Sequence, residues 1–250
     1  GTCAVSASSS GGGGGGGGGS KYETKFSLDK NKISIQLKQG EVKTESITIQ
    51  NPQNRKLKIN FEMVKLQDFF KINETSFELN PLETKILLLD VIAREETPPD
   101  VYLGKIIIRS ENEEKEILVV LDIKSKKALF DIKMQIPQEY KSVKPGGELF
   151  STIGIYNLGE LKRVDAIIEY TIMDSEGEKI LSEKETVAVE KQTSFIKKFI
   201  LPDNLNIGNY LLSVKIMYEG ETAVASSWFL VVSPNGMQKK VGIKIFLGIL

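Results

Sequence analysis

The chain has 250 residues, with 33 Lys and Arg against 33 Asp and Glu, no His and one Cys. A net charge of zero excludes recognition of nucleic acid or acidic membrane by bulk electrostatics, because such binders carry a basic excess. Without histidine, His-based metal sites and Ser-His or Cys-His catalytic pairs are excluded, and a single cysteine excludes an intrachain disulfide and Cys-rich metal cages.

The first twenty residues are predicted to lie outside the fold. Val5-Ser6-Ala7 has small side chains at its first and third positions, the pattern that signal peptidase accepts before its cut. Cys3 is interpreted as an inert thiol near this cleavage site, with a lipidated cysteine as the alternative. The unbroken run Gly11–Gly19 cannot bury apolar surface and predicts a flexible tether, either native or an expression linker. Residues 1–20 are therefore a signal-peptide remnant and a Gly/Ser tether.

From Lys21 to Val232 the sequence alternates apolar and polar residues with period two in short segments. Clear examples are Ile33–Leu37, Leu57–Met63, Val164–Ile172 and Tyr210–Tyr218. Period two places one face of each strand on a core and the other in water. Turn signals such as Asn-Pro and Glu-Gly separate the segments, which favours antiparallel β-sandwiches over a parallel sheet. The predicted fold class is all-β.

Two short segments of the first half interrupt this pattern. Asp68-Phe69-Phe70 is interpreted as an irregular crossover between sheets or as an exposed hydrophobic contact. Asn73-Glu74-Thr75 is an acceptor sequon in a predicted loop, so Asn73 is a candidate N-glycosylation site if the chain is exported into a glycosylating compartment.

The segments are organised as two copies of one unit. Glu41, Asn51 and Tyr102 each have a counterpart about 107 residues later, at Glu148, Asn157 and Tyr210. This spacing is the length of an immunoglobulin-like domain, with seven or so strands in two sheets of three and four.

The recurring residues have physical roles. An asparagine at a strand end can cap the following turn with its side chain. Tyr102 and Tyr210, at the entry of a late strand, predict tyrosine corners with a structural role. The boundary near Ser125 has almost no spacer, so residues 21–125 and 126–234 are predicted to be two immunoglobulin-like sandwiches that form a semi-rigid rod.

The C-terminal residues 235–250 are predicted to be a juxtamembrane segment and the start of a membrane anchor. Val241–Leu250 is apolar except for Lys244 and follows Lys239 and Lys240. Ten such residues are too short for a span, which needs about 20. The alternatives are therefore a truncated transmembrane helix, which we favour, and a last β-strand or apolar tail.

Turn and core motifs recur in the two copies and carry a family resemblance. They are Asn51-Pro52, Leu79–Thr84 and Val101–Ile106 in the first copy, and Pro145–Glu148, Ile155–Gly159, Leu201-Pro202 and Gly208–Tyr210 in the second. Through these motifs the first copy resembles the NEW3-type family and the second is similar to CARDB-like modules. Over about residues 25–232 the sequence resembles the tandem immunoglobulin-like ectodomains of prokaryotic, especially archaeal, cell-surface proteins. The NEW3 family usually has Pro-Gly-Glu where this chain has Pro81-Leu82-Glu83. The resemblance implies the sandwich fold and no shared catalytic residues.

Residues with catalytic or metal-binding chemistry are sparse. The Gly11–Gly19 run lacks the Lys-Ser/Thr of a phosphate loop. The acidic turn Asp174–Glu178 is interpreted as a solvated hairpin turn rather than a calcium loop, and Glu111, Glu113, Glu114 and Glu116 as a hydrated loop tip. For Trp228 we favour core or inter-domain packing over an aromatic ligand platform. No enzyme activity, metal or cofactor is expected.

The sequence therefore predicts a non-enzymatic ectodomain on the extracellular face of the membrane, anchored through its C-terminal segment. It would act as a structural or adhesive spacer that binds other surface proteins or glycans, and no nucleic acid, through loops or sheet edges. One alternative is an ancillary carbohydrate-binding module of a surface glycosidase system. Another is a chaperone-like sandwich that offers Phe26–Leu28 and Ile33–Leu37 as an edge for client strands.

Overall fold

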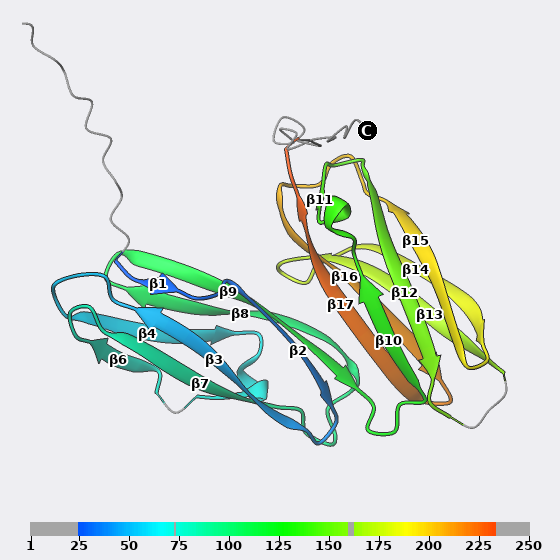
Figure 1. Cartoon of the computed structure of the whole chain (residues 1–250), viewed down its shortest axis with the longest axis horizontal. Helices are drawn as coiled ribbons and strands as arrows, with labels where there is room; N and C mark the ends of the chain where they lie inside the picture. The colour runs from blue at the N-terminus through cyan, green and yellow to red at the C-terminus, as the bar shows by residue number, and fades with distance from the viewer. Residues whose placement is uncertain (1–24, 73, 160–162, 234–250) are drawn as a thin grey trace, which may run out of the picture.

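The computed structural model describes residues 25–72, 74–159 and 163–233 (Figure 1). The regular elements of these ranges are β-strands, apart from two 3₁₀ turns at Gln67–Phe69 (η1) and Gln138–Tyr140 (η2). The prediction of an all-β chain of two tandem immunoglobulin-like sandwiches is confirmed. Within the described ranges no helix has the length and apolarity needed to cross a membrane. The predicted tether in residues 1–20 and the predicted anchor in residues 235–250 lie outside the described residues.

The first sandwich contains nine strands in two sheets. One sheet has the strand order β1-β3-β7-β5 and the other has the order β2-β9-β8-β4-β6. The strands are Ser27–Leu28 (β1), Lys32–Lys38 (β2), Val42–Gln50 (β3), Leu57–Val64 (β4), Phe70–Lys71 (β5), Ser76–Leu79 (β6), Thr84–Ile92 (β7), Asp100–Ser110 (β8) and Glu113–Lys124 (β9).

The second sandwich contains eight strands in two sheets. The smaller sheet has the order β10-β12-β15 and the larger has the order β11-β17-β16-β13-β14. The strands are Phe130–Gln135 (β10), Ser142–Val143 (β11), Glu148–Asn157 (β12), Val164–Asp174 (β13), Lys179–Val189 (β14), Gln192–Ile200 (β15), Gly208–Tyr218 (β16) and Glu221–Val231 (β17).

The two copies share one topology, since their strand orders coincide except for the additional β5 of the first copy. In each copy the first strand is divided between the sheets, and its second part pairs in parallel with the last strand, as β2 with β9 and β11 with β17. The three strands predicted for the smaller sheet occur in the second copy, but the first copy has four, and both larger sheets have five strands where four were predicted. The pairing is also not antiparallel throughout. Strands of two residues, such as β1, β5 and β11, are too short to show a period in the sequence.

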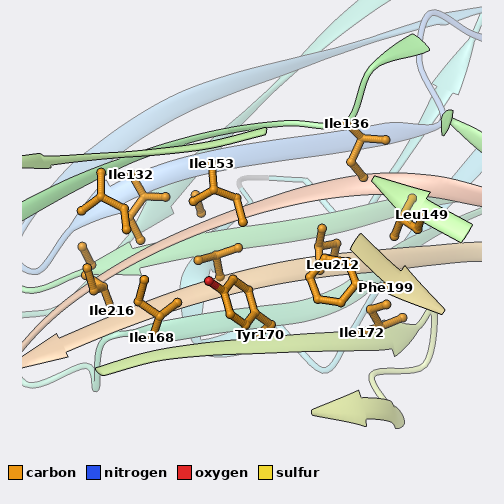
Figure 2. Close-up of a cluster of buried hydrophobic side chains, with 14 of the residues drawn as sticks. Ile132, Ile136, Leu149, Ile153, Ile168, Tyr170, Ile172, Phe199, Leu212 and Ile216 are labelled. Atoms are coloured by element: carbon orange, nitrogen blue, oxygen red, sulfur yellow. The ribbon is translucent and has the colours of Figure 1, made fainter. Parts of the chain in front are cut away.

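Each sandwich has its own hydrophobic core between its two sheets. Figure 2 shows the second core, where Ile132 and Ile153 of the small sheet face Ile168, Tyr170 and other side chains of the large sheet. Tyr170 is fully buried, and its hydroxyl donates to Glu185 Oε1 at 2.6 Å. Each fully buried apolar side chain contributes about 1.5–3 kcal/mol relative to exposure, so these cores account for fold stability without a disulfide.

Turns in the left-handed backbone region connect several strands. Glu219 (φ 48°) and Gly220 (φ 83°) form the tight turn between β16 and β17, where both central residues need positive φ. Leu82 also has a positive φ of 60°, and its side chain is 65% exposed. A leucine in this region of the backbone is strained.

Candidate functional site at the domain junction

The two sandwiches meet through the outer faces of their larger sheets, where β8 and β9 approach β17 (Figure 1). An apolar cluster fills the contact: Leu118 and Val120 of β9, Met173 of β13, Leu211 of β16 and Trp228 of β17. All residues from Ile117 to Lys124 are consequently buried, because one face of β9 covers its own core and the other covers the second domain.

A buried carboxylate connects the domains at this contact. Both oxygens of Asp122 on β9 accept hydrogen bonds from Ser226 on β17, one from the backbone N–H at 2.9 Å and one from the hydroxyl at 2.6 Å. Burial raises the pKa of Asp122 to about 6, although the two Ser226 hydrogen bonds and the charge of Lys124 act in the opposite direction. The ionised form of Asp122 is therefore costly at this position.

Polar contacts surround the apolar cluster. In the linker, the N–H of Ser125 donates to Thr222 O at 2.9 Å, and Ser125 Oγ accepts from the Thr222 N–H at 2.8 Å. Ion pairs cross from one domain to the other, between Lys124 and Asp131 (2.6 Å), Lys215 and Asp100 (2.7 Å), and Lys105 and Glu176 (3.2 Å). The carboxylates of these pairs are exposed to solvent, so each pair contributes modestly, although Lys124 itself is buried. Together with the buried contacts, they hold one relative orientation of the two domains.

Trp228 lies in this junction, as inter-domain packing predicts, while its neighbour Phe229 points into the second core. The indole is 9% exposed, and Lys32 Nζ of the first domain lies 5.4 Å from the ring centroid. Within the described part of the chain, its buried Nε1–H has no hydrogen-bond partner. Lys141 Nζ donates to Ser227 Oγ at 3.1 Å and to Trp228 O at 3.3 Å.

The two predicted tyrosine corners lie at the starts of β8 and β16. The Tyr102 hydroxyl donates to Pro98 O at 2.7 Å, and the Tyr210 hydroxyl donates to Asn206 O at 3.0 Å, four residues upstream in both copies. Burial raises the pKa of both phenols. Phe69 of the 3₁₀ turn lies 4.7 Å from the Tyr102 ring, so the Asp68–Phe70 segment is the crossover from β4 to β5. The two hydroxyl hydrogen bonds stabilise the fold.

Asn51 and Asn157, at the ends of the equivalent strands β3 and β12, each cap the turn that follows the strand. Asn51 Oδ1 accepts from the Gln53 N–H at 2.9 Å, and Asn157 Oδ1 accepts from the Gly159 N–H at 2.9 Å. The Asn51 carboxamide also donates to Arg55 O and Asn80 O, each at 2.8 Å, and the residue is fully buried. This is the side-chain capping of a turn that the repeat predicts.

The acidic residues identified in the sequence are used in turns and ion pairs. Asp174 Oδ1 accepts from the N–H groups of Glu176 and Glu178, which closes the hairpin turn. No group of three or more potential metal ligands occurs among the residues that the structure describes. The sequon residue Asn73 lies outside the described residues.

The glutamates of the predicted hydrated loop tip are exposed or partly exposed, and basic side chains of the same hairpin and of neighbouring segments pair with them. Glu111 pairs with Arg55 and Lys25, whose hydrogen bonds lower its pKa to about 2. The other pairs are Glu113 with Lys115, Glu114 with Arg109, and Glu116 with Lys105.

Each smaller sheet has an open edge with exposed apolar side chains. In the described part of the chain, β15 pairs only with β12, and β5 covers β7 only opposite Asp90 and Val91. On β7, Ile86 and Leu88 are 62% and 59% exposed; on β15, Ile196 and Ile200 are 70% and 63% exposed. The predicted edge segments Phe26–Leu28 and Ile33–Leu37 also lie at sheet edges, at β1 and in β2, but the side chains of Phe26 and Ile33 are buried there.

No family model matches the chain, and no curated protein matches it. Among solved structures, a protein of unknown function from Porphyromonas gingivalis W83 is 11% identical, with 82% of this chain and 99% of that chain covered and a TM-score of 0.43. The CupB2 chaperone of Pseudomonas aeruginosa is 10% identical, with 82% and 100% covered and a TM-score of 0.32. PapD-like domain 7 of human CEP192 is 12% identical, with 42% and 88% covered and a TM-score of 0.34. At these values the similarities carry no argument about a ligand or partner.

Proposed function

We propose that the protein is a non-enzymatic cell-surface ectodomain, a structural or adhesive spacer that binds other surface proteins or glycans through its sheet edges. The observation that carries this proposal is the open edge with exposed isoleucine and leucine side chains on β7 and β15, present in both copies. The resemblance to NEW3- and CARDB-like surface modules, and the signal-like and anchor-like ends of the sequence, support the extracellular location.

An open edge favours binding because its backbone N–H and C=O groups can pair with an extended segment of another molecule. Exposed apolar side chains at alternate positions add contact area on one face of the added strand. Because the junction holds the two domains in one orientation, the edges of β7 and β15 are presented at a constant separation. A partner can therefore engage both edges together, which raises its effective affinity.

The binding claim is tested with fluorescently labelled protein added to intact cells of the producing organism. We expect saturable binding that is lost when Leu88→Lys and Ile196→Lys are combined, because edge lysines oppose strand addition. Ile207→Lys is the matched control, since Ile207 is 67% exposed but lies in the loop before β16. Equal binding of both variants would show that the edges are not the contact.

The location is tested separately by labelling intact producing cells with an amine reagent that does not cross membranes. Lysines of both sandwiches should be labelled before the cells are broken. Labelling of these lysines only after lysis would contradict a surface ectodomain, whatever the binding experiment shows.

The same open edges also favour a chaperone-like sandwich as the second candidate. That function requires transient binding of unfolded clients, so the protein would suppress the aggregation of a denatured test protein in proportion to its concentration. We expect no suppression. Binding on a glycan array without edge dependence would instead favour the carbohydrate-binding alternative.

A further inference from the structure

We propose that a cavity at the domain junction binds one unit of a neutral sugar or a related polyol, through the hydroxyl groups of Thr171 and Ser213 and the carboxylate of Glu169. The cavity is separate from the open edges of β7 and β15, and purified protein is enough to test it. The inference therefore does not depend on the proposed surface function.

The cavity has a volume of about 230 Å³ and is lined by residues of both sandwiches. Asp100 and Val101, at the start of β8, come from the first sandwich, and Thr171 on β13 and Ser213 on β16 come from the second. Sites for drug-sized ligands measure roughly 300–1,000 Å³, so this cavity suits a smaller ligand, such as a single ring. The site is complete only when the two domains are docked.

Two buried hydroxyl groups line the cavity side by side. Thr171 and Ser213 are cross-strand partners and are 7% and 5% exposed. The next residue of this row is Ser226, which lies opposite Ser213 and donates its hydroxyl to Asp122 of the first sandwich. The cross-strand neighbour of Asp122 is Val101, an apolar residue that lines the cavity and offers no acceptor. Among the residues that the structure describes, neither the Thr171 nor the Ser213 hydroxyl has a hydrogen-bond partner. Polar groups this deeply buried are nearly always hydrogen-bonded, so the pair points to a polar ligand in the cavity.

The charged side chains of the lining balance one another, which favours a ligand without net charge. Asp100 and Lys215 pair across the junction at 2.7 Å. Glu169 lies opposite Lys215 on the neighbouring strand, and in the described part of the chain its carboxylate has only long contacts, at 3.4 and 3.7 Å, with side chains of β14. Lys179 also lines the cavity and has no ion pair within residues 25–72, 74–159 and 163–233. One carboxylate and one ammonium group therefore remain for a ligand.

A polyol matches this combination of groups, because each of its hydroxyls can both donate and accept a hydrogen bond. Glu169 can accept from the ligand, Lys179 can donate to it, and the two buried hydroxyls can do either. Val101 and Met173 supply apolar surface for the C–H groups of a sugar ring. A ligand with a net charge would add an unbalanced charge to a partly buried site.

Isothermal titration calorimetry on the full chain tests the site. Glucose, galactose, N-acetylglucosamine and myo-inositol are titrated separately, with glucuronate as the charged comparison and glycine as the zwitterionic one. We expect saturable one-to-one binding of at least one of the four neutral polyols. Tighter binding of an oligosaccharide of that sugar would assign the site to the end of a glycan chain, and equal binding to the free sugar. Absence of saturable binding by all four, or tighter binding of glucuronate or glycine, would overturn the proposal.

Variants establish which residues bind the ligand. Glu169→Gln should weaken the affinity by about tenfold or more, because it removes a charge-assisted hydrogen bond. Thr171→Val and Ser213→Ala should each weaken it by about three- to tenfold, and Thr171→Ser should retain it. Thr186→Val is the matched control, because Thr186 is exposed on the same sheet and lies opposite Ile167, away from the cavity lining.

The stability of the Thr171→Val variant separates binding from a structural role. Because the substitution removes a hydroxyl that has no partner in the described chain, the midpoint of urea unfolding without sugar should not fall. A clear fall would show that the hydroxyl stabilises the fold and would count against the assignment. Unchanged affinity in the combined Thr171→Val and Ser213→Ala variant, or an equal loss in Thr186→Val, would refute it.

Discussion

Replacing Asp122 with asparagine removes an ionisable group that is buried at the domain junction while leaving a side chain of the same shape. The Asp122 pKa is about 6 in the folded protein, against an ordinary value of 3.8. A carboxyl group with a raised pKa stabilises the folded state most at pH values below 3.8, and this contribution is lost as the pH rises through about 6. The difference corresponds to about 3 kcal/mol at neutral pH.

The Asp122→Asn variant stays neutral at every pH, and its carboxamide can both accept from the Ser226 N–H and donate to the Ser226 hydroxyl. We therefore expect it to be more stable than the wild type at pH 8, by up to about 3 kcal/mol, and equal to it near pH 4. Urea unfolding followed by Trp228 fluorescence, at several pH values, measures this difference.

Taking the difference between the two proteins cancels the other titrating groups, such as Glu111, whose pKa is lowered to about 2. Asp165→Asn, on an exposed position of β13, is the control for a change of net charge. A variant that is less stable than the wild type at pH 8, or a difference that does not vary with pH, would refute the reasoning.

Four further substitutions test the turns and corners, all by urea unfolding. Asn51→Ala should lower the free energy of unfolding by about 3 kcal/mol, because it leaves several buried backbone groups without partners; a loss below about 1 kcal/mol would contradict this. Leu82→Gly should raise it by up to about 1 kcal/mol, since glycine accepts a φ of 60° without strain, and a clear loss would count against a strained turn. Tyr102→Phe and Tyr210→Phe should each lower it by about 1 kcal/mol through the lost hydroxyl hydrogen bond, and a neutral result would show that the corner bond is not stabilising.

Much of the fold could be predicted because strand burial follows a strict period of two. In Leu57–Val64, for example, the first, third and fifth residues are buried and the residues between them are exposed. The repeat could also be predicted, because Asn51 and Asn157 each cap the turn at the end of equivalent strands. Caps of this kind join residues that are close in the sequence, so the same residue type recurs at the same place in both copies.

The junction was harder to predict because it depends on how two outer sheet faces meet. Besides Trp228, its sequence signal is the continuous apolar run from Ile117 to Leu121, which is typical of a strand buried on both faces. The contact between Asp122 and Ser226 joins residues 104 positions apart, and neither residue is unusual in its local sequence. The open edges of β7 and β15 could not be predicted either, because they depend on which strands pair. Short strands such as β5 influence that pairing, and two residues are too few to show an alternation of apolar and polar side chains.

The two sandwiches are docked in one orientation through the apolar cluster and the Asp122–Ser226 contact, rather than joined by a free hinge. Spin labels are attached to Thr84→Cys on β7 and Thr152→Cys on β12, in a Cys3→Ser background. Electron spin resonance then measures the distance between the smaller sheets of the two domains directly. The docked junction predicts a single narrow distance distribution. A broad distribution, like that of two domains moving independently about Ser125, would contradict it.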